Sequence, residues 1–449
     1  MTPNILLILT DQHHADYLGL FGRQVLRTPN LDALAEESDV FTSAYTPSPI
    51  CGPARVSLFT NQYPLEHGVC KNWVPPRDES RLLTRRLADA GYYNGLVGKL
   101  HISPAEDMHG FHWRRLCDSP HDVYERAEVT CNDYLTWVTD ELGLNVEEVA
   151  ERAGESERCG ADDVHFWEGW AWIDDRHQMT TWTGNEAVEF INAYERSEPF
   201  FLNVSFFGPH HPYATCEPWD SMYDPDDMVL PETFEKPPPA GQVGKRFDWP
   251  EKRWRDMIAK YCGNITAIDM QIGRIAAALR ERGLWDNTLI VFTADHGDHM
   301  GEFAMLGKGT MLEASARIPM LVKPPHAARG RREREEVVSL IDLYPTLLDY
   351  AGAANGRRSL RRVIDDCGTW ENETFSYIGS PDGRNGRTMV IRDNLKLVGV
   401  IRDGELTNEL TDRRQPPRDG HYREASACSE KERALQRRLR EWLDNQRLA

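Results

Sequence analysis

The chain has 449 residues, enough for two or three average domains or for one large α/β domain with an appendage. Its formal net charge of -19 argues against nucleic acid and anionic membranes as partners, although a locally basic pocket is compatible with that total. The sequence contains no run of eighteen apolar residues, so we expect no membrane span.

The nine cysteines form an odd set without close pairs. Their spacing predicts neither a CxxC metal site nor a disulfide scaffold. The chain begins Met-Thr-Pro-Asn and enters an apolar run at Ile5, which leaves no room for a secretory leader. We therefore expect a cytoplasmic protein, unless a natural leader has been trimmed away.

The first predicted element is a strand over residues 4–10, followed directly by Asp11. This continuous, β-branched apolar run is typical of a strand buried on both faces of a parallel sheet. A run of the same character at residues 289–293 leads into Asp295. Because open α/β sheets hold their ligands at the carboxyl ends of the strands, we expect both carboxylates at that edge.

Residues 51–55, Cys-Gly-Pro-Ala-Arg, are expected to begin a helix, because Pro53 fits a first turn, where its missing N–H costs nothing. The helix N-terminus would hold Cys51 in a partly positive field. Arg55, one turn further on, would lie on the same face and could clamp an anion. The segment therefore predicts a nucleophile that acts on an oxyanion ester.

Helical patterns at residues 183–194 and 261–282 alternate with apolar runs at residues 200–206 and 319–322. This alternation predicts an α/β fold, with a large doubly wound mixed sheet flanked by helices. Short alternating segments and a final charged helix at residues 429–448 predict a small α+β subdomain at the C-terminus.

We expect the main α/β domain to span residues 1–360 and the α+β subdomain to span residues 361–449. The segment from about 104 to 180 is rich in Trp, Asp, Glu and His without clean periodicity, so we expect an insertion over the ligand-binding edge. Residues 214–250 carry many prolines and predict an extended surface connection.

Cys51, Pro53 and Arg55 fit the pattern Cys-x-Pro-x-Arg, and in this the chain resembles the type I sulfatases of the alkaline phosphatase superfamily. In that family the cysteine is oxidised to formylglycine after translation. The agreement with the family runs in order from residue 4 to about residue 350. The resemblance implies a metal site formed by Asp11, Gln12, Cys51, Asp295 and His296.

Gln12 and His296 resemble the variant of this metal set found in phosphonate monoester hydrolases and in some sulfatases. The family more often has Asp and Asn at these two positions. Carboxylates are hard-oxygen ligands, so we expect one divalent cation, with calcium preferred. One imidazole weakens the case for calcium and leaves manganese open.

Three further segments and one residue fit the resemblance. The segments are Gly98-Lys99-Leu100-His101, the segment around His210 and Gly307-Lys308-Gly309, and the residue is Asn72, in the loop after the helix that Cys51 begins. The resemblance implies that Lys99 and Lys308 bind the ester anion and that Asn72 and His210 contribute to substrate binding. The nearby side chains of His211, Asp298 and His299 are interpreted as structural.

The implied reaction is hydrolysis of a sulfate monoester. The metal, Arg55 and the two lysines would neutralise the oxyanion and hold it in line with the nucleophile. Asp295 would activate one hydroxyl of the formylglycine hydrate, whose pKa the metal lowers. His210, alone or with Lys308, would protonate the departing alcohol. His101 would then deprotonate the second hydroxyl, so that the aldehyde re-forms and sulfate leaves.

Two alternatives stay open. A phosphonate monoester or phosphodiester hydrolase built on the same site is favoured by Gln12, His296 and Asn72. A non-catalytic metal- or glycan-binding protein would keep Cys51 unconverted.

The expected ligand is a small-molecule or saccharide sulfate ester, and the alcohol half is not identified by the sequence. The expected protein partner is a formylglycine-generating maturation enzyme. The sequence leaves open whether the chain forms a homo-oligomer.

Overall fold

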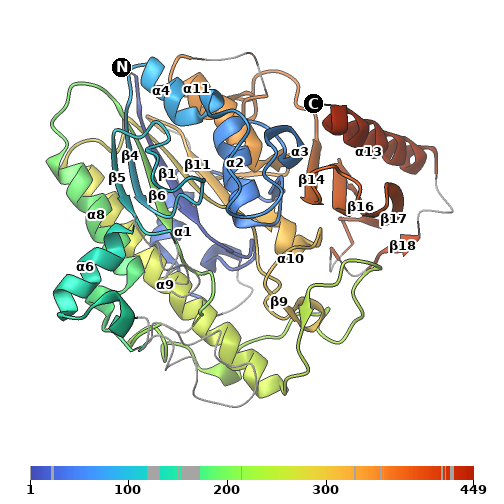
Figure 1. Ribbon diagram of the computed structural model, residues 1–449, viewed down its shortest axis with the longest axis horizontal. Helices are drawn as coiled ribbons and strands as arrows, with labels where there is room; N and C mark the ends of the chain where they lie inside the picture. Colours follow the sequence, from blue (N-terminus) through green and yellow to red (C-terminus); the bar gives the residue numbers. More distant parts are fainter. Residues whose placement is uncertain are drawn as a thin grey trace.

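Figure 1 shows the computed structural model of the chain. The structure describes residues 2–21, 25–118, 132–149, 152, 172–213, 215–327, 330–353, 356, 358–415, 418–419, 421–424 and 429–448. All helices, strands and contacts below belong to these residues.

An eight-stranded mixed sheet forms the centre of the molecule. Its central strands pair in parallel, whereas β11 runs antiparallel to both of its neighbours, β8 and β2. In spatial order the strands are β12 (Arg332–Arg334), β2 (Asp39–Phe41), β11 (Met320–Lys323), β8 (Thr288–Ala294), β1 (Asn4–Thr10), β6 (Phe200–Phe206), β4 (Tyr93–Gly98) and β5 (Trp113–Leu116).

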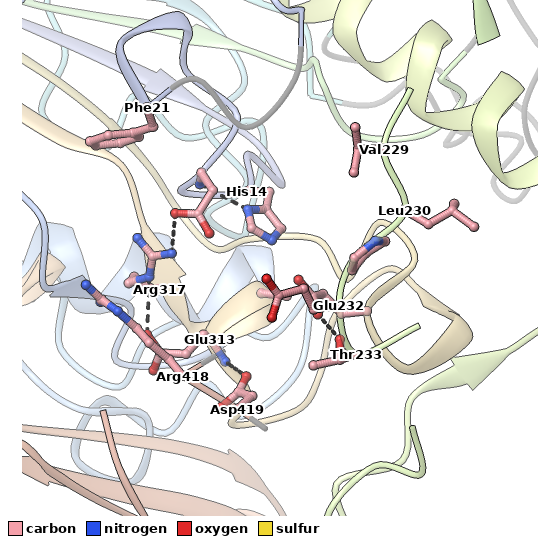
Figure 2. Close-up of a pocket in the computed structure, with 14 residues that line it drawn as sticks. His14, Phe21, Val229, Leu230, Glu232, Thr233, Glu313, Arg317, Arg418 and Asp419 are labelled. Atoms are coloured by element: carbon pink, nitrogen blue, oxygen red, sulfur yellow. Dashed lines mark hydrogen bonds and ion pairs between the residues drawn. The ribbon is translucent and has the colours of Figure 1, made fainter. Parts of the chain in front are cut away.

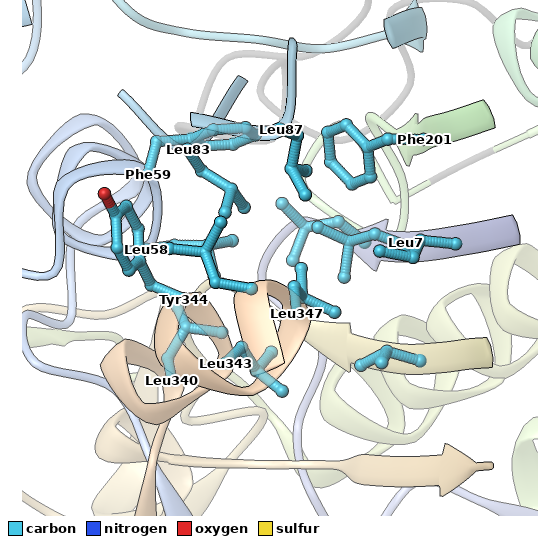
Figure 3. Close-up of a cluster of buried hydrophobic side chains, with 14 of the residues drawn as sticks. Leu7, Leu58, Phe59, Leu83, Leu87, Phe201, Leu340, Leu343, Tyr344 and Leu347 are labelled. Carbon is cyan, nitrogen blue, oxygen red and sulfur yellow. The ribbon is translucent and has the colours of Figure 1, made fainter. Parts of the chain in front are cut away.

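One face of this sheet is covered by α2 (Cys51–Thr60), α4 (Leu83–Asp89) and α11 (Leu343–Tyr350). Figure 3 shows Leu7 of β1 directed toward apolar side chains of these helices. Successive side chains of a strand point to opposite faces, so Leu7 belongs to this core whereas Leu6 and Ile8 belong to another.

The opposite face is covered by α1 (Pro29–Ala35), α8 (Met179–Ala193) and α9 (Glu251–Glu281). The sheet is therefore buried on both sides, which explains the unbroken apolar runs of its central strands. The observed architecture confirms the expected α/β fold with helices on both faces of a large mixed sheet.

The C-terminal part forms a second, antiparallel sheet, against which α13 (Glu430–Leu448) packs. The ring of Trp442 in α13 stacks on that of Phe375, with ring centroids 4.8 Å apart. The strands are β14 (Glu373–Gly379), β15 (Gly386–Arg392), β16 (Leu395–Arg402), β17 (Glu405–Asp412) and β18 (Arg423–Glu424). This sheet and its helix confirm the expected small C-terminal subdomain.

Smaller elements complete the description. A three-stranded sheet contains, in order, β10 (Arg317–Ile318), β3 (Ala44–Tyr45) and β13 (Val338–Ser339). A two-stranded sheet pairs β7 (Lys245–Arg246) with β9 (Met305–Leu306). The remaining helices of four residues or more are α3 (Pro64–His67), α6 (Asp133–Leu142), α10 (Glu313–Ala316) and α12 (Arg361–Ile364).

Two elements differ from their expected positions. Helix α9 begins at Glu251, ten residues before the expected start, because its first turns are polar outside yet bury Trp254 and Met257. The segment expected as an insertion contributes β5, the edge strand of the large sheet, and α6. Residues 119–131, 150–151 and 153–171 of that segment lie outside the described residues. None of the helices that the structure describes is long and apolar enough to cross a membrane.

Candidate active site

The site lies where β1 and β8 end. These strands are adjacent and parallel, with Thr10 opposite Ala294, so the next residues, Asp11 and Asp295, emerge at the same edge of the sheet. The backbone N–H of Asp295 donates to the Thr10 carbonyl at 3.2 Å, which ties the two strand ends together. Both aspartates are completely buried.

Four potential metal ligands meet at this edge: Asp11, Cys51, Asp295 and His296, whose ligand atoms all lie within 4.8 Å of one another. His296 Nε2 is 3.1 Å from Cys51 Sγ and 3.7 Å from Asp11 Oδ1. His296 Nδ1 lies 3.0 Å from the Gly297 carbonyl, to which it can donate. In the neutral ring that hydrogen bond selects the tautomer whose Nε2 lone pair faces the cluster. Burial opposes a charge on the ring, yet Asp295 raises the pKa of His296 above its ordinary value.

Helix α2 presents Cys51 to this cluster from its first residue. Ile50 precedes the helix in an extended conformation, and the N–H of Gly52 donates to Asn72 Oδ1 at 2.9 Å. Asn72, expected to bind substrate, is thus placed beside Cys51 as a cap on the helix start. The backbone N–H of Gly52 in the first turn is therefore satisfied by Asn72 and does not need the Cys51 side chain.

The electrostatic surroundings separate Cys51 from the other cysteines of the described part of the chain. Burial and the Asp11 carboxylate oppose its ionisation, yet Lys308, Lys99 and His296 bring the pKa of Cys51 below its ordinary value. Burial instead raises the pKa of Cys70 to about 11 and that of Cys216 to about 12. The pKa values of Cys117 and Cys262 are also raised by burial. Among the buried cysteines of the described residues, Cys51 is therefore the one whose surroundings favour the thiolate.

Arg55 has its donors directed at the protein. Its Nε lies 2.8 Å from Asp295 Oδ2 and its Nη2 lies 3.2 Å from Asp11 Oδ2, while Nη1 donates to the Lys99 carbonyl and to Ser205 Oγ. The side chain is 1% exposed. These contacts hold the two carboxylates in place, and the expectation that Arg55 clamps the substrate anion stays a prediction.

Two lysines bring positive charge to the carboxylates and to Cys51. Lys99 Nζ is 2.9 Å from Asp11 Oδ2, and Lys308 Nζ is 3.0 Å from Cys51 Sγ. Burial alone would lower the pKa of Lys99, but Asp11 and Cys51 raise it above the ordinary value. Burial alone would raise the pKa of Asp11, but Lys99, His210 and Lys308 hold it well below the ordinary value. The groups are therefore ionised together, as an anion-binding site requires.

Gln12 points the two ends of its amide in opposite directions. Its Oε1 accepts from Lys308 Nζ at 2.7 Å, whereas its Nε2 donates to Asp298 Oδ2 at 2.5 Å. Its backbone has a φ of 63°, a left-handed conformation that is uncommon outside glycine. The amide oxygen thus faces the lysine and Cys51, in agreement with a ligand or anion-site role.

His101 is a buried histidine with no hydrogen-bond partner on either ring nitrogen among the described residues. Its ring lies against that of Trp73, with centroids 4.3 Å apart, and its backbone N–H is held by Asp118 at 2.8 Å. Burial, followed by the charges of Lys99 and Arg55, lowers the pKa of His101 well below its ordinary value. The neutral ring can accept a proton, as a general base must.

His210 approaches the cluster from the loop after β6. Its Nε2 is 4.0 Å from Asp11 Oδ1, and its Nδ1 lies 2.6 Å from the His211 carbonyl, to which it donates. Burial, followed by His211 and Lys308, lowers the pKa of His210 well below its ordinary value. The ring therefore offers Nε2 toward the site and must gain a proton there before it can serve as an acid.

Asp298, which was interpreted from the sequence as structural, lies near the site. It is fully buried and accepts a hydrogen bond from the Gln12 amide. Its position three residues after Asp295 is the sequence signal that places it near the site.

None of the four potential metal ligands lines the cavity of about 410 Å³ that His14 reaches, three residues after Asp11 (Figure 2). On the wall of this cavity Arg317 pairs with Asp16 and Glu313.

Comparison with known proteins covers most of the chain. Residues 3–353 match the family described as Sulfatase, and residues 301–447 match the family described as N-sulphoglucosamine sulphohydrolase, C-terminal.

Among individual proteins, an arylsulfatase of Clostridium perfringens is 34% identical over 379 residues, which cover 78% of this chain and 75% of the relative. A multifunctional alkaline phosphatase superfamily protein of Trinickia caryophylli is 32% identical over 390 residues, which cover 79% of this chain and 74% of the relative. A phosphonate monoester hydrolase from Silicibacter pomeroyi has a similar structure, with a TM-score of 0.79 and 23% identity, covering 99% of this chain and 95% of that one.

Proposed function

The chain belongs to the sulfatase family and is a sulfuric ester hydrolase, and from this premise we propose that formylglycine made from Cys51 is its nucleophile. The reaction is hydrolysis of a sulfate monoester with release of inorganic sulfate. One divalent cation, bound by Asp11, Gln12, Asp295, His296 and residue 51, takes part.

The observation that carries this proposal is the surroundings of Cys51. The sulfur lies at the start of α2, 3.1 Å from His296 Nε2 and 3.0 Å from Lys308 Nζ. A nucleophile there has positive charge on one side and carboxylates on the other. An ester oxyanion at the same point would be neutralised by groups that are already in position.

The donor chemistry of the site fits a divalent cation. Two buried carboxylates, an imidazole Nε2 and the side chain of residue 51 lie within 4.8 Å of one another. Oxygen ligands of this kind suit calcium, and the imidazole keeps manganese as the second candidate. A bound cation supplies positive charge beside the ester oxygen and lowers the pKa of the nucleophilic hydroxyl.

The chain's own residues divide the remaining work. Arg55 holds the carboxylates of Asp11 and Asp295 in place, and so acts on the reaction through them. Lys99 and Lys308 hold the ester anion in line with residue 51. Both are within 4 Å of an Asp11 carboxylate oxygen, so their charges are fixed before substrate arrives.

The two neutral histidines handle the protons. His210 delivers a proton from Nε2 to the departing alcohol oxygen, and the anionic substrate next to the ring favours the protonated form that this step needs. His101 receives the proton of the second hydroxyl of residue 51, because its ring nitrogens have no other partner among the described residues. The aldehyde then re-forms as its bond to the sulfate oxygen breaks and inorganic sulfate leaves, and addition of water to the aldehyde restores the two hydroxyls for another substrate.

A second candidate function is phosphonate monoester hydrolysis on the same residues. Gln12 and His296 favour it, since the chain resembles phosphonate hydrolases at these two positions. The similar structure of the Silicibacter pomeroyi enzyme supports the shared fold alone.

The experiment compares kcat/KM for an aryl sulfate and for the aryl phosphonate monoester with the same leaving group. The enzyme is produced together with a formylglycine-generating maturation enzyme, the partner that we propose, and Cys51→Ala serves as the blank. We expect the sulfate to be the better substrate. A higher kcat/KM for the phosphonate would establish the second candidate instead.

The substrate class that we propose is a small or saccharide sulfate ester. The cytoplasmic location stays a prediction, and so do the limits of the two domains.

A further inference from the structure

Asp298 is buried and has four hydrogen-bond donors around its carboxylate. Oδ2 accepts from Gln12 Nε2 at 2.5 Å and from the Tyr213 hydroxyl. Oδ1 accepts from the backbone N–H groups of Met300 and Gly307, both at 2.9 Å. Three of these four donors, the backbone N–H groups of Met300 and Gly307 and the amino group of Gln12, cannot accept, so the oxygens of Asp298 are the acceptors in all three hydrogen bonds.

Two of these hydrogen bonds lead directly to site residues. Gln12 carries the amide whose other end accepts from Lys308, and Gly307 precedes Lys308 in the chain. Lys308 in turn lies 3.0 Å from Cys51 Sγ and 3.9 Å from Asp11 Oδ1. The Asp298 carboxylate therefore contacts both Gly307, which precedes Lys308, and the Gln12 amide, which accepts a hydrogen bond from Lys308.

The chemistry of the Gln12–Asp298 contact fixes which end of the amide faces the site. The Lys308 ammonium can only donate, so it requires the oxygen end of the Gln12 amide, and the NH2 end is left to donate to Asp298. The oxygen end must then face Lys308 and the metal ligands. With the amide reversed, two acceptors would meet at Asp298, and an N–H group would point at Lys308 and at any bound cation.

We propose that Asp298 is a positioning residue, which sets the orientation of the Gln12 amide and the place of the loop that carries Lys308. The proposal rests on the proposed function in treating Gln12 and Lys308 as groups of the active site. It extends that function by assigning a task to a residue outside the metal and substrate sets.

The pair suggests a double-variant experiment. In Asp298→Asn, the new amide faces the Gln12 amide, so Gln12 is driven to reverse and to turn its N–H groups toward the site. In Gln12→Glu, two carboxylates meet at a contact that now measures 2.5 Å. In the double variant every partner is again satisfied. The amide introduced by Asp298→Asn accepts from Met300 and Gly307 through its oxygen, and it donates through its nitrogen to the carboxylate introduced by Gln12→Glu.

Two measurements are made on the full chain, produced with the maturation enzyme. The first is the melting temperature of all four proteins in EDTA, which reports the contribution of the Gln12–Asp298 contact to stability. The second is the Kd for calcium or manganese by titration calorimetry, which reports the effect of that contact on the metal site. We expect each single variant to melt below the wild type and the double variant to recover most of the loss. We expect Asp298→Asn to weaken ion binding about 10- to 100-fold and the double variant to bind at least as tightly as the wild type.

Asp269→Asn is the matched control. Asp269 is a buried carboxylate that accepts from both nitrogens of Asn30 and from the Leu31 N–H, all on α1. Its variant should melt lower while the Kd for the ion is unchanged.

Additive losses of melting temperature in the double variant would overturn the pairing of Gln12 with Asp298. An unchanged Kd in Asp298→Asn would overturn the positioning role and leave Asp298 a structural residue. If the wild-type protein binds neither ion, the metal part of the proposed function fails, and the melting temperatures in EDTA still decide whether the two side chains are paired.

Discussion

Arg55 Nε lies 2.8 Å from Asp295 Oδ2, and both side chains are buried. The same guanidinium reaches Asp11 Oδ2 at 3.2 Å, so one residue of α2 joins the carboxylates that follow two neighbouring strands. Helix α2 and the sheet edge are thereby fixed to each other through a charged contact that solvent does not screen.

We predict that Arg55→Met destabilises the protein strongly, because the buried Asp295 carboxylate loses its guanidinium partner and Asp11 keeps only its lysines. The expected loss in free energy of unfolding is about 3–5 kcal/mol, measured by urea denaturation in EDTA. Arg361→Met is the matched control, since Arg361 pairs with Asp365 at 3.0 Å where both side chains are nearly half exposed. The control should lose no more than about 1 kcal/mol. Equal losses in the two variants would show that Arg55 does not hold the carboxylates.

The residues at strand ends were predictable from sequence, whereas those held by distant partners were not. Asp11 and Asp295 follow unbroken apolar runs, and parallel pairing alone places such ends at one edge. The role that we propose for Asp298 depends on hydrogen bonds from Gln12 and Tyr213, which are 286 and 85 residues away in the chain. No local pattern carries that information.

The fold shows the same division. The alternation of strands and helices predicted the two-sided sheet, but not that β11 would pair antiparallel with β8. Strand direction depends on how the chain returns to the sheet, which the composition of a four-residue strand does not record. The spacing of Arg55 from Cys51 does not reveal its contacts with Asp11 and Asp295, because these carboxylates follow strands that are distant from α2 in the sequence.

We predict that the effect of His210→Ala depends on the alcohol that leaves. An alkoxide needs a proton in the transition state and a nitrophenolate does not, and general acid catalysis is worth about 10²–10⁴ in rate. The variant should therefore lose a factor in that range in kcat on an alkyl or sugar sulfate and much less on a nitrophenyl sulfate. Equal losses on both substrates would mean that His210 only positions the sulfate group, with Lys308 the next candidate acid.

We predict a pH-dependent contribution to stability from His67. Burial lowers the pKa of His67 to about 3, and the ring accepts from the Val69 N–H and contacts Ser57 Oγ at 2.9 Å. Below the unfolded pKa of about 6.5 the unfolded chain binds a proton that the folded chain does not, so stability is lost as the pH falls. Wild type should therefore lose about 2 kcal/mol more than His67→Gln between pH 7.5 and pH 5. Urea unfolding of both proteins at the two pH values measures this difference, and parallel losses would show that His67 is protonated in the folded protein.

We predict that removal of divalent ions abolishes turnover and lowers the melting temperature. The cation bound by Asp11 and Asp295 binds only the folded chain, so its removal takes away that stabilisation. Calcium at 100 times its Kd should restore about 2.7 kcal/mol of stability. Manganese should replace calcium with a different Kd. Asp11→Asn is the control and should show little response to either ion. Full turnover after dialysis against EDTA would show that the reaction does not require a divalent cation.

The most direct test of the central claim is sulfate release measured against the fraction of chains that carry formylglycine at position 51. That fraction is set by varying co-expression of the maturation enzyme and is read by mass spectrometry of the peptide that contains residue 51. The account predicts that turnover of a sulfate monoester rises in proportion to the fraction and vanishes when every chain retains Cys51. Turnover that is independent of the fraction, or absent from fully converted protein, would contradict it.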